Sequence, residues 1–311
     1  MDIVSVCICT FRRPVLLRRL LLAVFAQQTL NCQIEVIVVD NDIHQSASGV
    51  LSEFKSLYPE QLQCIALSES NISLARNAAI NAATGNWICM IDDDEYPEND
   101  WLTNLFKTQI QYQADVVFAP VVPDYERGVP SWIIRGGYFD RRRLATGTLI
   151  DDKNARSGNV LVAKSMLDKL STEHEEGPFD PAFGKTGGED TMLFRTLGAN
   201  GARMIWCDDA PVSEVVPIER ASASWMLQRS FRTGQLFMRT ELAMVVGTGA
   251  VSRGIWLACR AFAQLVVAFF VALCLSIFAP LRAFHWVRVA ASQLGKLNHF
   301  RGVGSNVYGD K

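Results

Sequence analysis

Apolar and polar positions form two alternating kinds of pattern over the first 210 residues. Short apolar runs rich in β-branched residues, at 2–11, 34–39 and 62–67, are typical of buried strands. Apolar residues three and four positions apart predict helices, one beginning at Pro14 and others over 50–57 and 73–83. Strands that alternate with helices of this length indicate βαβ units. We therefore expect an α/β fold with a mostly parallel sheet flanked by helices.

The pattern becomes less regular after residue 114. Residues 115–119, 158–163 and 203–207 have strand character, and a polar segment with tryptophan and arginine covers 129–152. A glycine-rich loop at 178–191 leads into a predicted helix at 192–197. With 311 residues, the chain is long enough for about two domains.

An apolar stretch without charged residues covers residues 261–281 near the C-terminus. It is long enough to cross a hydrocarbon layer of roughly 30 Å. Arg253 and Arg260 precede it and Arg282 follows it, so the positive-inside rule does not decide an orientation. A spanning or hairpin segment is favoured, and an interfacial helix or a buried helix of a soluble domain are the alternatives.

Composition excludes several classes of protein. The net charge of -2 argues against a general nucleic-acid binder. The eight cysteines have no paired spacing, so neither a zinc site nor a disulfide framework is predicted, and a reducing cytosol is expected. The first residues do not fit a signal peptide, because the apolar run is short and the arginines follow it.

Three consecutive aspartates, Asp92, Asp93 and Asp94, follow the apolar run at 86–91. If that run is a strand, the acids lie at its carboxyl end, where open α/β sheets bind ligands. Adjacent carboxylates repel one another, and Mg²⁺ or Mn²⁺ can bridge such groups to substrate phosphates. A metal–diphosphate site is one interpretation. An acidic turn that starts a helix, with Glu95 as a helix-start acid, is the other.

Several motifs occur in a specific order. Residues 10–13 read Thr-Phe-Arg-Arg in a strand-to-helix turn, Asp40 ends a strand, and residues 74–77 read Leu-Ala-Arg-Asn. The aspartate triplet follows, and residues 187–190 read Gly-Gly-Glu-Asp. This order resembles the family 2 inverting glycosyltransferases of the GT-A fold, and most of all bacterial exopolysaccharide enzymes of the succinoglycan type. The resemblance covers about residues 3–210.

The resemblance implies a catalytic domain over 1–220, with a nucleotide-sugar half at about 1–113 and an acceptor half at about 114–220. A helical, membrane-associated region would cover 221–311. In the donor site, Asp94 would bind Mg²⁺ or Mn²⁺ directly, Asp92 would support the metal and the nucleotide, and Asp93 would hold the variable middle position. The residues expected to line the nucleotide-sugar site are Thr10, Phe11, Arg12, Asp40, Arg76, Asp92 and Asp93. Turn capping by Asp40 and an ordinary surface position for Arg76 are the alternatives.

Inversion at the anomeric carbon requires a base opposite the leaving group. Asp190 is the expected base and Glu189 is expected to orient the site, although a loop that caps the following helix is the alternative. Two adjacent acids in this role should differ in environment, and a raised pKa would suit one of them. The resemblance also places Gly158 and Asn159 at the acceptor or the diphosphate site. Trp132 and the arginines at 141–143 could contact sugars or phosphates, or form a solvated basic surface.

The function expected is transfer of one hexose, with glucose and a β linkage implied, from a UDP-sugar to a lipid-linked oligosaccharide in exopolysaccharide biosynthesis. Polyprenyl diphosphate would carry the acceptor at the cytoplasmic face of the inner membrane, where other polysaccharide-biosynthesis proteins are further potential partners. Residues 225–232 depart from the Gln-x-x-Arg-Trp pattern of processive members, which favours single-sugar transfer. The alternatives are a non-catalytic nucleotide-sugar-binding subunit and a sugar nucleotidyltransferase, which would require a glycine-rich phosphate loop near residue 10.

Overall fold

The computed structural model describes residues 2–28, 32–151, 155–171, 177–245 and 247–301. These residues belong to two compact units. The first, called here the sheet unit, lies within Met1–Pro123 and Arg141–Val215. The second, the helical unit, lies within Asp124–Asp140 and Val216–Val307. Each unit is described by itself.

The sheet unit is built on a seven-stranded sheet in the order β3-β2-β1-β4-β8-β6-β9. Its strands are β1 (Asp2–Thr10), β2 (Cys32–Asp40), β3 (Leu62–Ala66), β4 (Trp87–Asp92), β6 (Val116–Phe118), β8 (Val160–Ala163) and β9 (Met204–Trp206). Pairing is parallel throughout except at β8, which is antiparallel to β4 and β6. The α/β fold and the mostly parallel sheet predicted from the sequence are confirmed.

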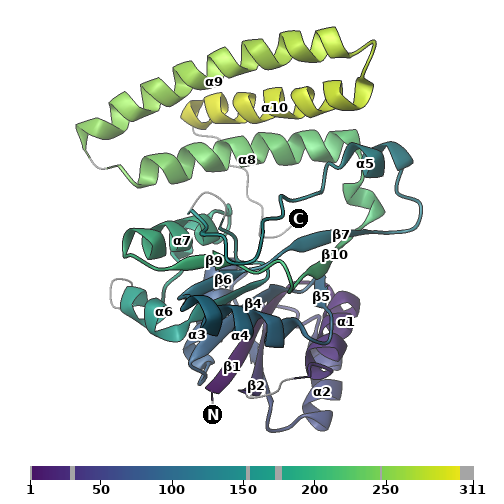
Figure 1. Cartoon of the computed structure of the whole chain (residues 1–311), viewed down its shortest axis with the longest axis vertical. Helices are drawn as coiled ribbons and strands as arrows, with labels where there is room; N and C mark the ends of the chain where they lie inside the picture. The colour runs from purple at the N-terminus through teal and green to yellow at the C-terminus, as the bar shows by residue number, and fades with distance from the viewer. Residues whose placement is uncertain (1, 29–31, 152–154, 172–176, 246, 302–311) are drawn as a thin grey trace. The chain divides into compact units, whose positions relative to one another are not determined.

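Helices cover both faces of this sheet (Figure 1). They are α1 (Pro14–Phe25), α2 (Ser48–Leu57), α3 (Ile72–Ala82), α4 (Trp101–Tyr112), α6 (Lys164–Ser171) and α7 (Glu189–Ala199). Side chains of β1 alternate between two cores, with Val6 and Ile8 in one and Cys7 in the other. The first core includes residues of α1, α2 and α4, and the second includes residues of α3, α6 and α7. This two-sided burial explains why the strands read as continuous apolar runs.

A second sheet was not expected from the sequence. Its three strands, in the order β5-β10-β7, are β5 (Glu95–Pro97), β7 (Val121–Tyr125) and β10 (Val212–Val216). β5 follows β4 after a turn at Asp93 and Asp94. The acidic triplet therefore does not start a helix, and the expectation that Glu95 is a helix-start acid was wrong. The strands are too short and irregular to give a clear alternation in sequence.

The helical unit contains α5 (Ser131–Gly136), α8 (Ala223–Ala243), α9 (Thr248–Leu275) and α10 (Pro280–Asn298). α10 packs against both α8 and α9, and the three long helices lie side by side in Figure 1. Among the described residues, one helix is long and apolar enough to cross a membrane, over Gly249–Leu275 with a mean hydropathy of 2.1. Pro280 begins a new helix, so the apolar stretch predicted at 261–281 is divided between α9, a turn and α10.

Aromatic side chains form the core at one end of the helical unit. The ring of Trp132 lies 5.3 Å from that of Phe284 and 5.8 Å from that of Tyr138, in edge-on arrangements. The Tyr138 hydroxyl donates a hydrogen bond of 2.9 Å to the Leu281 carbonyl. Trp132, which the sequence suggested as a sugar-binding residue, is thus part of the packing between α5 and α10.

Asn159 connects three segments inside the sheet unit. Its Oδ1 accepts a 2.7 Å hydrogen bond from the indole of Trp101, and its Nδ2 donates to the carbonyls of Pro120 and Ala210 at 2.8 and 2.9 Å. The side chain is fully buried, and its φ of 54° is a conformation that asparagine tolerates better than most residues. Asn159 was expected at the acceptor or the diphosphate site, but its side chain is buried in the core and all of its hydrogen bonds given above are made there.

We predict that Asn159→Ala lowers the free energy of unfolding by about 2–4 kcal/mol, because it leaves buried polar groups unpaired. Urea unfolding followed by tryptophan fluorescence would measure this. Asn200→Ala is the matched control, since Asn200 is exposed, and a change of about 0.5 kcal/mol or less is expected there. Equal effects at the two positions would contradict the role assigned to Asn159.

Candidate active site

Strand register brings the predicted donor-site residues to one edge of the sheet. β1 lies between β2 and β4 and is parallel to both, with Thr10 opposite Asp40 and Cys9 opposite Asp92. Because parallel strands end at the same edge, the turn after β1 is next to the acids after β4. Carboxyl ends of such strands are the usual position for ligands in open α/β sheets.

Asp93 fixes the β1–α1 turn to the end of β4. Its Oδ2 accepts hydrogen bonds from the Thr10 hydroxyl at 2.9 Å and from the Phe11 amide at 3.4 Å. Its Oδ1 accepts from Arg13 Nη1 at 2.8 Å. Burial raises the pKa of Asp93 to about 6, against the opposing effect of Arg13. These contacts give Asp93 a structural role. The sequence analysis did not predict this role, because it treated Asp93 as the variable middle residue of the triplet.

Arg13 is the central cation of this site, and sequence reasoning did not select it. The same Nη1 that contacts Asp93 lies 3.0 Å from Asp94 Oδ2, so one guanidinium nitrogen bridges two carboxylates. Burial alone would lower the pKa of Arg13, but Asp93 and Asp94 outweigh it and raise the pKa above its ordinary value. The sequence feature that could have indicated it is the position of Arg13 directly before Pro14, in the turn after β1, the strand that pairs with β4.

Arg12 adopts a left-handed conformation with a φ of 56° in the same turn. Its Nε lies 3.3 Å from Asp42 Oδ1, and its amide donates to the Ser46 hydroxyl at 3.2 Å. Positive φ at a bulky residue costs about 1 kcal/mol or more and persists only where surrounding contacts enforce it. The turn is thus held in one shape from both sides, by Asp93 and by the segment after β2.

Asp92 and Asp94 supply oxygen ligands of the kind that hard divalent cations prefer. The Asp92 side chain is 48% exposed at the end of β4, whereas Asp94 is almost buried. Within the described part of the chain, no group of three or more His, Cys, Asp or Glu side chains is arranged to hold a metal. A pair of carboxylates still fits Mg²⁺ or Mn²⁺, because such ions are commonly bound by one or two carboxylates and completed by substrate phosphates.

Arg76 joins the donor-side acids to the pair at 189–190. Its Nη1 lies 2.6 Å from Glu189 Oε1, and its Nη2 lies 3.3 Å from Asp92 Oδ1. The Arg76 side chain is only 10% exposed, so it is not an ordinary surface arginine. It projects from α3, whose first turn is capped by the Asn71 side chain. Asp92 and Glu189, which are 97 positions apart in sequence, therefore share one counter-ion.

Glu189 and Asp190 form the first turn of α7, one turn earlier than the helix predicted from the sequence. Gly187 and Gly188 precede them with φ values of 84° and 98°, a conformation that side chains rarely adopt. Two left-handed glycines thus set the direction in which the helix begins. Acids at a helix N-terminus are stabilised by the unpaired amides there, and Asp190 accepts a 2.6 Å bond from the Thr191 amide.

The two acids have different environments, as expected. Burial raises the pKa of Glu189 to about 7, with Arg76 opposing this shift. Glu189 Oε2 is buried and has no hydrogen-bond partner among the described residues, which favours a protonated oxygen. Asp190 is only partly buried. Of the two carboxyls, that of Asp190 is the more accessible, whereas that of Glu189 is buried against Arg76.

Asp40 makes the contacts of a capping residue. Its carboxylate accepts hydrogen bonds from the amides of Ala47 at 2.9 Å and Asp42 at 3.1 Å, and the residue is 1% exposed. These bonds shape the segment between β2 and α2. A contact between Asp40 and a nucleotide remains a prediction.

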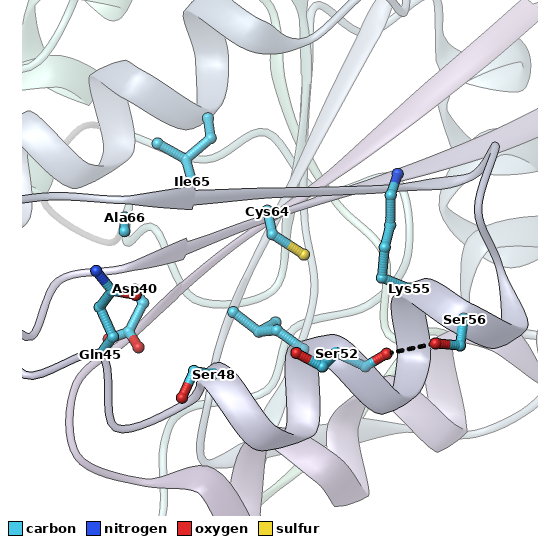
Figure 2. Close-up of a pocket in the computed structure, with 10 residues that line it drawn as sticks. Asp40, Gln45, Ser48, Ser52, Lys55, Ser56, Cys64, Ile65 and Ala66 are labelled. Carbon is cyan, nitrogen blue, oxygen red and sulfur yellow. Dashed lines mark hydrogen bonds between the residues drawn. The ribbon is translucent and has the colours of Figure 1, made fainter.

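A pocket of about 530 Å³ opens between α2 and β3. Figure 2 shows Asp40, Gln45 and Ala66 towards one end and Lys55 and Ser56 towards the other. Its lining does not include the aspartates after β4. The candidate active site is therefore defined by the carboxylate and arginine network, not by this pocket.

The arginine run at 141–143 is partly neutralised within the sheet unit. Arg141 forms an ion pair with Glu214, and Arg143 pairs with Asp208 through contacts of 2.9 and 3.0 Å. Arg141 also faces the buried carboxyl of Glu95, whose pKa is raised by burial and by Asp92. Arg141 is thus a partly buried residue of the sheet unit, whereas Arg143 is an exposed arginine with an acidic partner.

The chain is similar to known glycosyltransferases. Residues 5–168 match the family model for glycosyl transferase family 2. The succinoglycan biosynthesis protein ExoM of Rhizobium meliloti (strain 1021) is 31% identical over 233 residues, which cover 75% of this chain and 73% of ExoM. The glucosyl-dolichyl phosphate glucuronosyltransferase of Haloferax volcanii is 26% identical over 64% of each chain.

Solved structures show the same fold. The mannosyltransferase PcManGT of Pyrobaculum calidifontis, in complex with GDP-Man and Mn²⁺, has a TM-score of 0.65 at 17% identity and covers 96% of this chain and 86% of that one. S. aureus TarS 1-349 with UDP-GlcNAc has a TM-score of 0.53 at 15% identity, covering 97% and 92%. The mostly parallel sheet and these structural neighbours show a fold of the GT-A type, and the family model shows a glycosyltransferase. The chain belongs to glycosyl transferase family 2.

We predict that Glu189 makes the protein less stable as the pH rises from 5 to 8. An unfolded glutamate loses its proton near pH 4.3, whereas folded Glu189 keeps it to about pH 7, so the folded state binds more protons in between. Relative to Glu189→Gln, the wild type should lose about 1–3 kcal/mol over this range. Urea unfolding at several pH values would measure the difference. For Glu60→Gln, at an exposed position, the free energy of unfolding should change with pH as it does in the wild type. If Glu189→Gln also shows the pH dependence of the wild type, the raised pKa of Glu189 is refuted.

Proposed function

We propose that this glycosyltransferase moves a single hexose, with inversion, from a UDP-sugar to a lipid-linked oligosaccharide in exopolysaccharide biosynthesis. The observation that carries the proposal is the Arg76 bridge, which joins Asp92 on the donor side to Glu189 beside the expected base. Donor acids and acceptor acids thus belong to one site, as transfer between two bound substrates requires.

The donor end is formed by the β1–α1 turn and the acidic triplet. Thr10, Phe11 and Arg12 lie in a turn held rigidly by Asp93, and would receive the nucleotide together with Asp40. Asp94 and Asp92 would hold Mg²⁺ or Mn²⁺. When bound there, such an ion neutralises the charge of the diphosphate leaving group. Arg13 and Arg76 already balance part of the negative charge in this region.

The acceptor end is formed by the first turn of α7. Asp190 takes the proton of the acceptor hydroxyl, whose oxygen attacks the anomeric carbon from the side opposite the diphosphate. Glu189 acts as a positioning residue, since its carboxyl is buried and bound to Arg76. A fixed base and a fixed donor convert the reaction into an encounter within one site, which lowers the entropic part of the barrier.

The finer features of the proposal have separate support. The ExoM relative is a succinoglycan biosynthesis protein, which favours exopolysaccharide assembly. Glucose and a β linkage are proposed from the family resemblance. TarS binds UDP-GlcNAc, which favours a UDP-linked donor, and PcManGT binds Mn²⁺ beside its nucleotide sugar. The apolar helix α9 supports membrane association. We place the protein at the cytoplasmic face, where a polyprenyl-linked acceptor and other biosynthesis proteins would be present.

The test of the base is Asp190→Asn. We expect at least about 100-fold slower transfer, because proton removal is lost, with donor affinity changed less than about twofold. Membranes containing lipid-linked acceptors, incubated with a panel of radiolabelled UDP-sugars, would measure transfer and identify the donor. Asp100→Asn, at an exposed position, is the control. Undiminished function in Asp190→Asn would favour a non-catalytic nucleotide-sugar-binding subunit.

The test of the metal ligand is Asp94→Ala. We expect the metal-dependent part of UDP-sugar affinity to disappear, while binding measured with a chelator stays the same. Titration calorimetry with and without Mn²⁺ would separate the two contributions. Asp100→Ala should behave like the wild type. An unchanged metal-dependent affinity in Asp94→Ala would refute this assignment.

A further inference from the structure

α9 has one buried face and one exposed apolar face. Leu257, Ala261 and Ala268 are buried on one side. On the other side, large apolar residues are 54–61% exposed, namely Phe262, Val267, Phe269, Phe270 and Leu273. An exposed surface of this kind is uncommon on a soluble unit and marks a contact with a partner or a membrane.

The buried face of α9 is held by α10, which is in turn locked to α8. A Cβ added at Gly234 of α8 would lie 1.9 Å from the Ser292 carbonyl oxygen of α10. A Cβ added at Gly295 of α10 would lie 1.9 Å from the Phe231 carbonyl oxygen of α8. These reciprocal glycines bring the two backbones into direct contact. α9 cannot enter a bilayer along its full length unless α10 and α8 enter with it.

The length of α9 also argues against a spanning orientation. Its charge-free part after Arg260 covers residues 261–275, and at about 1.5 Å per residue this reaches only about 22 Å. A hydrocarbon layer is roughly 30 Å thick. A span that began at Gly249 would be long enough, but it would place Arg260 near its middle. Charged side chains at that depth are strongly unfavourable.

Charge is distributed unevenly between this region and the rest of the chain. Residues 223–298 contain eight arginines and lysines and a single acid, Glu241, although the whole chain has a net charge of -2. Glu241 is paired with Arg253 at 2.8 Å. Exposed arginines lie at both ends of the apolar face, with Arg253 and Arg260 near one end and Arg282 near the other. Cations that border an apolar face match the headgroups of an anionic bilayer.

We propose that α9 lies flat in the surface of an anionic membrane, with its apolar face at the boundary between headgroups and acyl chains. α8 and α10 remain on the water side of α9. Trp256 supports this depth, because the guanidinium groups of Arg253 and Arg260 lie 5.0 and 5.4 Å from its ring, and such amphipathic groups favour the interface. The proposal rests on the proposed function only in that the acceptor is lipid-linked.

Two native cysteines provide a depth measurement. Cys259 and Cys274 are both exposed on α9, and their separation of fifteen positions corresponds to about 22 Å along the helix. An environment-sensitive fluorophore is attached to Cys259 in the variant Cys64→Ser/Cys274→Ser. It is attached to Cys274 in the variant Cys64→Ser/Cys259→Ser. The variant in which Cys64, Cys259 and Cys274 are all replaced by serine gives the fluorescence from labelling at other cysteines, which is subtracted. Full-length protein is bound to vesicles with spin labels at shallow or deep acyl positions.

A flat α9 predicts that both fluorophores are quenched to the same extent, and more strongly by the shallow spin label. Unequal depths for the two sites, or stronger quenching by the deep label, would mean that α9 spans and would overturn the proposal. Vesicles with one quarter phosphatidylglycerol should bind the protein at least about tenfold more tightly than neutral phosphatidylcholine vesicles, with the difference lost in high salt. Equal binding to both compositions would also overturn it.

The variant Phe270→Glu tests whether vesicle binding requires the apolar face of α9 or only an exposed apolar residue anywhere on the protein. It should weaken vesicle binding at least about tenfold, whereas Ile110→Glu, at an equally exposed residue of α4, should leave binding unchanged. Retained UDP-sugar binding in Phe270→Glu shows that the variant is folded. If the wild type ignores vesicles and instead forms a dimer that Phe270→Glu disrupts, the surface binds a second copy and the proposal is wrong. Neither result would bear on glycosyl transfer itself, which the Asp190 and Asp94 variants test.

Discussion

The structure of this glycosyltransferase depends on the neutralisation of a group of carboxylates at one edge of its sheet. Asp92, Asp93 and Asp94 are consecutive, and Glu189 reaches the same region from α7. Held together without counter-charge, these groups would repel one another and favour unfolding. Two arginines prevent this, the partly exposed Arg13 from the turn after β1 and the buried Arg76 from α3. Each guanidinium contacts two carboxylates, so each connects elements that are distant in sequence.

The parallel sheet is what makes this arrangement possible. Since β1 lies between β2 and β4, the turn after β1 has acids on both sides, at Asp42 and at Asp93. The turn after β1 then directs Arg13, and the helix after β3 directs Arg76, towards the end of β4. Apolar cores on both faces of the sheet hold these helices in place. Core packing thus determines where the charges lie, and the charges determine which ligands the edge can accept.

The fold was largely predictable from sequence, because continuous apolar strands and amphipathic helices give strong patterns. The order of acidic motifs also identified Asp92, Glu189 and their neighbours. Arg13 was missed, since its importance comes from the pairing of β1 with β4 and not from any local pattern. Asn159 was misassigned because its motif position could not show that the side chain is buried. The apolar stretch at 261–281 was read as one segment, since hydropathy does not register the break before Pro280.

The bridge formed by Arg13 has a consequence for how this enzyme can change in evolution. The turn that is proposed to bind the nucleotide also contains Arg13, which neutralises Asp94, the expected metal ligand. A substitution that reshapes the turn for another nucleotide would move that guanidinium, and so alter the charge left for a metal. If the turn binds the nucleotide and Asp94 binds the metal, as proposed, nucleotide selection and metal preference are coupled traits in this chain. Variation in one should be accompanied by compensating variation in the other, across the pairing of β1 and β4.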